Sequence, residues 1–191
     1  MFMLRKPTDE AIRAFLAAQQ SHPFSYPDVG ASRNCAPAGY NVDHNRVQLG
    51  SGQADFARAV AHLRQWKMFD LGWLHLCWPD APIQKDATVA VLVSHLGFWS
   101  LNPCRIVYVL DEHEHTERFG FAYGTLRGHA EHGEERFSVE FDPRDQSVWY
   151  DIHAFSRPGP VARLAYPLAR ALQKKFAADS LEAMLRAMHH V

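Results

Sequence analysis

Three stretches of alternating side chains, followed by a long amphipathic segment, constrain the fold of this chain more than any other feature. In residues 119–125, large side chains alternate with glycine and alanine, and a two-residue period returns in residues 135–141 and 147–155. Successive side chains of a strand point to opposite faces of a sheet, so each stretch predicts a strand. Residues 127–134 and 142–145 carry turn residues and no apolar period, which predicts hairpin connections. The first strand has an aromatic face and a nearly bare face, and the bare face predicts either a closely packed helix or room for a ligand.

The chain from Tyr40 onward supplies further strands and two helices. Apolar residues recur at helical spacing in residues 53–66 and again after Pro160 to about His189. Pro167 suits a first turn better than a helix interior, so the second helix should begin or bend at Tyr166. Further strands are predicted at residues 40–49, 70–78, 87–96 and 103–111. This order favours an α+β helix-grip fold, in which a curved antiparallel sheet of about seven strands wraps around the C-terminal helix and leaves a cavity unless side chains fill it.

The first 39 residues are expected to form an extension of this domain. Thr8 is a suitable N-cap for a short amphipathic helix that ends near Gln20. Residues 21–39 are rich in Pro, Gly, Ser and Asn, which predicts an irregular connection. Such a long connection is expected to cover a sheet edge or a cavity mouth. We therefore divide the chain into residues 1–39, a helix and connection, and residues 40–191, a single helix-grip domain.

Charge and cysteine content exclude several classes of function. The formal net charge of −1 provides no field that would attract nucleic acid or an anionic membrane. The three cysteines are widely spaced and form no CxxC pair. We therefore expect reduced thiols and no disulfide framework. No apolar run is long enough to span a membrane. These features predict a cytoplasmic protein without a cofactor.

Several short motifs resemble one protein family. They are residues 120–126 (GFAYGTL), 128–129 (GH), 133–137 (GEERF) and 155–158 (FSRP), with residues 46–52 (RVQLGSG) and 72–73 (GW) in the first half. Together they are similar to the family called domain of unknown function nineteen-ninety, over roughly residue 40 to the C-terminus. The resemblance implies a fold similar to the START and birch-pollen-allergen superfamily, whose members bind lipids, sterols and polyketides or act as cyclases or hydrolases. It implies no particular reaction.

The densest group of polar residues lies around the last two predicted strands. The 142–145 turn folds one strand onto the other, so either Arg136 or Glu135 should lie near His153, and a shift of one residue would move every side chain to the other face. Candidate acid–base residues are His129, Glu134 and His153. Candidate ligand-binding residues are Tyr123, Thr125, Arg136, His153, Ser156 and Arg157. The alternative is a set of cross-strand ion pairs on a solvated face.

Two histidine pairs invite comparison with metal sites. Residues 113–115 (HEH) and the pair His129 and His132 have spacings found among zinc ligands. Both pairs lie in polar stretches without an identifiable third ligand. We therefore expect solvated loops and no metal site.

Three functions remain open. The favoured one is binding of a small apolar or amphipathic molecule in the cavity, since such sites combine apolar walls with a few polar groups. The second is a cyclase, lyase or hydrolase using His/Glu chemistry in the same cavity. The third is a non-catalytic module that contacts other proteins. A monomer or a homodimer would suit each of them.

Overall fold

The fold is an α+β helix-grip, as the sequence predicts. The computed structural model describes residues 1–78, 80–95, 97–113, 115–159, 163 and 166–189. One antiparallel sheet has the order β2-β8-β7-β6-β5-β4-β3, with the short β1 paired to β5. The strands are β1 (Phe2–Met3), β2 (Asn41–Ser51), β3 (Leu74–Cys77), β4 (Thr88–His95), β5 (Phe98–His113), β6 (Glu117–Thr125), β7 (Glu131–Phe141) and β8 (Ser147–Pro158).

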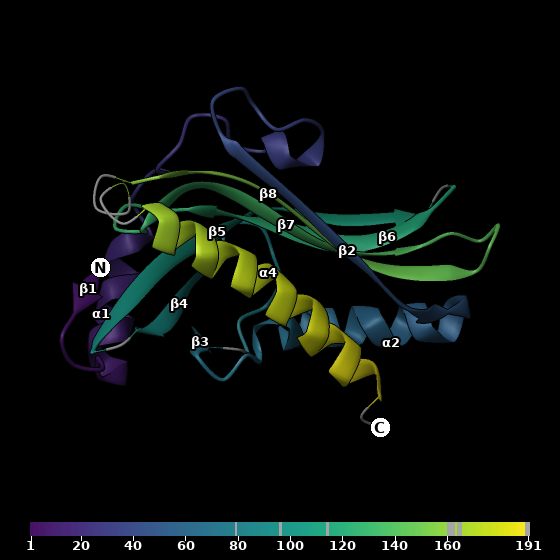
Figure 1. Cartoon of the computed structure of the whole chain (residues 1–191), viewed down its shortest axis with the longest axis horizontal. Helices are drawn as coiled ribbons and strands as arrows, with labels where there is room; N and C mark the ends of the chain where they lie inside the picture. The colour runs from purple at the N-terminus through teal and green to yellow at the C-terminus, as the bar shows by residue number, and fades with distance from the viewer. Residues whose placement is uncertain (79, 96, 114, 160–162, 164–165, 190–191) are drawn as a thin grey trace.

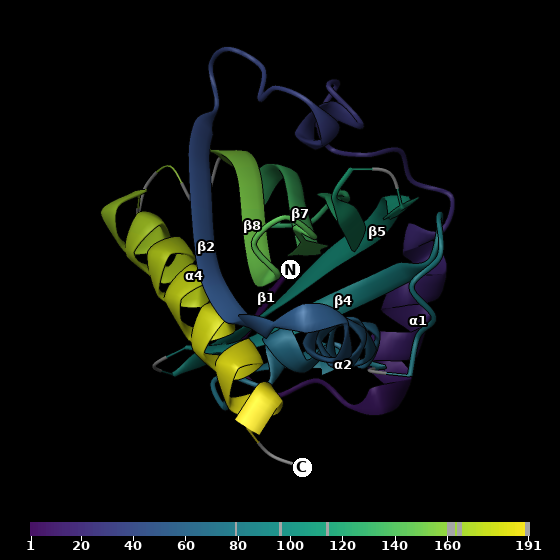
Figure 2. The ribbon, with the colours of Figure 1, turned by 90° about the vertical axis from the view of Figure 1, so that its right-hand side faces the viewer.

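Helices lie on both sides of this sheet. They are α1 (Asp9–Gln19), α2 (Gly52–Arg64) and α4 (Tyr166–His189), with two single 3₁₀ turns, η1 (Ala31–Arg33) and η2 (Lys67–Phe69). In Figures 1 and 2 the sheet curves around α4, and α2 lies beside the C-terminal half of α4. Thr8 is the N-cap of α1, as predicted: its Oγ1 accepts a hydrogen bond from the Ala11 N–H over 3.3 Å.

Several boundaries differ from the sequence prediction. The strand expected from residue 70 begins at Leu74, because the η2 turn and the chain after it occupy the preceding residues. The strand β7 begins at Glu131 instead of residue 135, so half of the predicted hairpin loop belongs to the sheet. Gly133 allows this, since a Cβ there would lie 2.0 Å from the carbonyl oxygen of Phe155 on β8. Glycine thus permits a close strand approach in a segment that reads as a turn.

The two faces of β6 are covered by different parts of the chain. Its aromatic face packs into the core, where Phe121 lies 4.8 Å from Trp66 between ring centroids. The bare face is not covered by a helix, and that expectation is wrong. At Gly124 a Cβ would lie 2.1 Å from the Tyr26 hydroxyl and 2.9 Å from Phe24. The irregular connection therefore covers the outer face of β6 at Gly124, where the missing side chain makes room for it.

The helix α4 divides into two halves with different surroundings. Met184 and Met188 in its second half are buried in the main core beside α2. Leu172 and Phe176 in its first half line a cavity instead. The predicted helix also included residues 161–162 and 164–165, which lie outside the described residues. In the part of the chain that the structure describes, no helix is long and apolar enough to cross a membrane.

Candidate functional site

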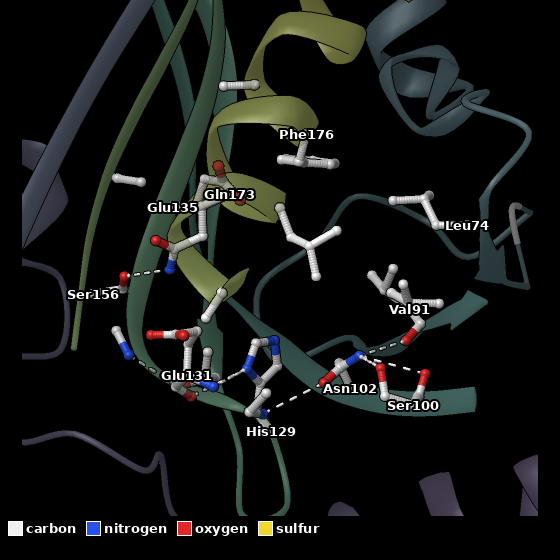
Figure 3. A pocket seen from close by; sticks show the side chains of 18 of the residues that line it. Leu74, Val91, Ser100, Asn102, His129, Glu131, Glu135, Ser156, Gln173 and Phe176 are labelled. Atoms are coloured by element: carbon white, nitrogen blue, oxygen red, sulfur yellow. Dashed lines mark hydrogen bonds between the residues drawn. The ribbon is translucent and has the colours of Figure 1, made fainter. Parts of the chain in front are cut away.

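A cavity of about 660 Å³ lies between the first half of α4 and the inner face of the sheet. Figure 3 shows it from close by, with Phe176 and Leu74 on its walls and a group of polar side chains at one side. Its volume lies within the range of small-molecule sites, and most of its lining is apolar.

Small side chains on facing elements explain why the cavity is there. Ala154 and Ser156 of β8 line it on the sheet side, and Ala169 and Ala177 line it on the helix side. In the second half of α4, the long side chain of Met184 fills the corresponding space and is fully buried. The change from Ala169 and Ala177 to Met184 along α4 therefore determines where the cavity ends and the packed core begins.

Glu135 is the central polar residue of the cavity wall. It lies on β7 directly opposite Tyr123 of β6, and the Tyr123 hydroxyl donates a 2.8 Å hydrogen bond to its carboxylate. Burial among aromatic residues penalises the charged form and raises the pKa of the Glu135 carboxyl group to about 7. Burial also raises the pKa of Tyr123, so its hydroxyl remains protonated and continues to donate.

A second carboxyl group, that of Glu131, lies further along β7 beside His129 (Figure 3). Burial raises the pKa of Glu131 to about 7, although Arg170 and Gln173 both oppose the shift. Burial lowers the pKa of His129 to about 3, so this imidazole is neutral at physiological pH. The His129 Nδ1 lies 2.9 Å from the Glu131 backbone nitrogen and 3.1 Å from the Glu131 carbonyl oxygen, so the backbone of Glu131 holds this side of the ring.

The remaining polar groups at this end are largely paired with one another. The Gln173 amide donates to the Ser156 hydroxyl over 2.9 Å. The Asn102 amide donates 3.0 Å to the Ser100 hydroxyl, and its oxygen accepts from the Ala130 N–H over 3.4 Å (Figure 3). The two carboxyl groups and the His129 Nε2 are therefore the groups best placed to meet a guest molecule.

The residues predicted from sequence do not gather in one place. Tyr123, Thr125, His129 and Ser156 line the cavity. The Thr125 hydroxyl is bonded to Ser25 over 2.6 Å and accepts from the Gly133 N–H over 3.0 Å. The predicted proximity of Arg136 and His153 is present, because the two residues are direct partners across β7 and β8.

Glu134 borders the cavity, but its carboxylate points toward the irregular connection on the outer face of the sheet. The carboxylate accepts hydrogen bonds from the Tyr26 hydroxyl (2.6 Å), the Gly30 N–H (2.7 Å), the Ser32 N–H (3.0 Å) and the Ser32 hydroxyl. Only 2 % of the residue is exposed. Its visible role is to hold the connection against the sheet.

Arg136 and His153 belong to a polar cluster on the outer face. The Arg136 guanidinium donates to Asp151 over 3.1 Å and to the Ser32 carbonyl over 3.0 Å. Asp151 also lies 2.5 Å from the His44 Nε2. The rings of His44 and His153 are 5.8 Å apart. Burial lowers the pKa of His153, and the nearby Arg136 lowers it further.

Arg157 lies outside the cavity as well. Its guanidinium stacks over the Tyr40 ring at 5.0 Å, beside a second, open pocket that His132 and Arg163 also line. Of the three predicted acid–base residues, only His129 faces the cavity with its side chain, and it is held neutral. Within the described residues, no group of three His, Cys, Asp or Glu side chains is arranged to hold a metal ion.

Glu131 and Glu135 line the cavity but were not among the predicted acid–base or ligand-binding residues. The signal for Glu135 was present, because in the alternating pattern of 135–141 it shares a face with the buried Phe137 and Val139. A carboxylate on the apolar face of a strand is unusual and points inward. No comparable signal identifies Glu131, since it lies in the segment that reads as a loop.

The curved sheet, the C-terminal helix and the cavity between them define a helix-grip protein with an internal cavity. The chain belongs to the DUF1990 family (domain of unknown function), whose model matches residues 25–183. A UPF0548 protein of Dictyostelium discoideum is 35% identical over 98% of this chain and 96% of its own length. A UPF0548 protein of Deinococcus radiodurans is 38% identical over 98% of each chain.

A solved structure shares the fold at low sequence identity. The hypothetical protein jhp0584 from Helicobacter pylori superposes with a TM-score of 0.52 and 14% identity, over 86% of this chain and 95% of its own. The similarity concerns the fold alone.

Proposed function

We propose that this protein binds a small, mostly apolar molecule in the cavity between α4 and the sheet. The observation that carries the proposal is the cavity itself, about 660 Å³ in volume and walled mainly by apolar side chains. A core that only stabilised the fold would be packed to the density seen around Met184, because unfilled apolar volume costs stability. Tyr123 and Ser156, predicted from sequence, then belong to the polar side of the site.

Filling the cavity with a side chain tests this proposal. Ala154 on β8 faces the cavity, so Ala154→Phe should occupy the space that a guest would take. The probe is the neutral fluorophore N-phenyl-1-naphthylamine, whose emission rises in apolar surroundings. We expect the wild type to bind one probe per chain and Ala154→Phe to weaken that binding by about tenfold or more, the loss of roughly 1.4 kcal/mol.

The matched control makes the same substitution at Ala57, an exposed position on α2. Ala57→Phe should bind the probe as the wild type does. Equal affinity in the wild type and in Ala154→Phe would contradict the proposal, provided that circular dichroism shows both proteins to be folded.

A further inference from the structure

The cavity wall carries negative but no positive side-chain charge. Among the described residues that line it are Asp43, Glu131, Glu134 and Glu135, but neither lysine nor arginine. Its histidines do not supply a cation either, since burial lowers the pKa of both His95 and His129.

Two of these four acids are held by ion pairs or by several hydrogen bonds to other parts of the chain. Asp43 is held by Arg170 of α4 in a two-point ion pair, with N–O distances of 2.6 and 2.7 Å. The hydrogen bonds of Glu134 tie it to the irregular connection on the other side of the sheet. Glu131 and Glu135 lie on β7 and face the same space (Figure 3). Tyr123 donates a hydrogen bond to Glu135, and Arg170 and Gln173 both favour the ionised form of Glu131.

Three aromatic rings line the same cavity as Glu135. Tyr123, Phe69 and Phe176 all line the cavity. The Phe69 ring lies 6.2 Å from that of Tyr123 and 5.4 Å from that of Phe176, between centroids. A carboxylate beside several aromatic rings is the chemical environment that favours an ammonium group, through charge pairing and through the negative faces of the rings. A carboxylate ligand would instead meet like charge at Glu135, since the nearby Arg170 is already paired with Asp43.

We propose that the guest of this cavity is a cationic amphiphile, an amine with an apolar body, whose ammonium group pairs with Glu135 and whose hydrocarbon part fills the space toward Leu74 and Leu172. This inference rests on the proposed function and narrows it to one ligand class. If the guest carries a second hydrogen-bond donor, Glu131 on the same strand accepts that hydrogen bond.

The charge state of Glu135 depends on groups from each neighbouring element. Tyr123 on β6 donates to it, Tyr150 on β8 and Cys104 on β5 remain neutral because burial raises the pKa of each, and Asp43 on β2 adds a repulsive charge. An incoming ammonium favours the ionised carboxylate. Binding near neutral pH therefore releases a proton from the part of the population in which Glu135 is protonated.

Three probes with the same hydrocarbon chain test the inference: decylamine, decanol and decanoate, each below its aggregation limit at neutral pH. Isothermal titration calorimetry on the full chain gives the three affinities. We expect decylamine to bind about tenfold or more tighter than decanol, and decanoate to bind least. Repeating the decylamine titration in buffers of different ionisation enthalpy should show proton release.

The variant Glu135→Gln keeps an acceptor for the Tyr123 hydroxyl but removes the charge. It should bind decylamine about tenfold more weakly while its affinity for decanol stays unchanged. Glu182→Gln, on the exposed side of α4, is the matched control and should behave as the wild type does.

The possible outcomes separate this inference from the function it rests on. If decanol and decanoate bind as tightly as decylamine, the cavity binds apolar molecules and the amine assignment is wrong. If Glu135→Gln leaves the preference for decylamine intact, Glu135 is not the partner and the assignment also fails. If none of the three probes binds, both the amine assignment and the proposed function are overturned.

Discussion

Glu135 combines two properties that rarely occur together, a position on the apolar face of a strand and a carboxyl group. Because burial raises its pKa from an ordinary value near 4.5 to about 7, the native protein retains a proton that the unfolded chain loses at lower pH. The unfolded state thus binds fewer protons between these two values, and the free energy of unfolding falls as the pH rises through this interval.

Glu135→Gln removes that pH dependence. We expect the stability of Glu135→Gln relative to the wild type to increase by about 2 kcal/mol between pH values below 4.5 and above 7, less than the full linkage value because the cavity admits water. Urea denaturation across this range measures the difference. Parallel stability curves for the two proteins would show that the carboxyl group titrates normally in the native state.

At the scale of elements, α4 performs two tasks with different residues. Its second half packs against α2 with fully buried side chains, whereas Leu168 in its first half is 59% exposed at the cavity. Met184→Ala should lower the free energy of unfolding by about 3 kcal/mol, because it opens a void in a closed core. Leu168→Ala should cost less than about 1 kcal/mol, as expected at an exposed position.

Thermal and urea unfolding of the two variants measure this contrast. Binding of the fluorescent probe should respond in the opposite sense, with Leu168→Ala altering affinity and Met184→Ala leaving it near the wild-type value at temperatures where the protein is folded. Equal losses of stability would mean that the two halves of α4 are not distinct.

At the scale of the whole molecule, the irregular connection of residues 21–39 forms a third layer on the outer side of the sheet. The irregular connection lies over the outer face of β6 and β7, and the buried carboxylate of Glu134 accepts its hydrogen bonds. Glu134→Ala leaves the Gly30 and Ser32 N–H groups without that acceptor, at a cost of about 3 kcal/mol. Hydrogen exchange should then accelerate in the connection, while the amides of β7 remain protected.

Glu112→Ala is the control for this experiment. Glu112 pairs with Arg118 over 3.2 Å at the surface, and exposed ion pairs contribute less than about 1 kcal/mol. Unchanged exchange in the connection of Glu134→Ala would show that other contacts, such as those of Phe24 with Gly124, hold this layer in place.

The sheet and the helix that it grips follow from local patterns, and local patterns predicted them. Alternation in residues 119–155 identifies the central strands, and helical spacing identifies α2 and α4. The contacts of Glu134 join residues more than one hundred positions apart in the chain, and no local pattern encodes them. The prediction of the site residues was incomplete for a related reason. Along β7, Glu135 faces the cavity, whereas its neighbours Glu134 and Arg136 form hydrogen bonds on the outer face of the sheet.

The division of α4 into a cavity-lining half and a core-packing half also affects which substitutions the protein can accept. The cavity-lining part of α4 includes the exposed Leu168, whereas Met184 and Met188, which secure the helix in the core, do not line the cavity. Substitutions at Leu168, Ala169, Leu172 and Gln173 can therefore alter selectivity while the fold is retained. The same separation makes this half of the helix a suitable target for a library that redirects the cavity to a new compound.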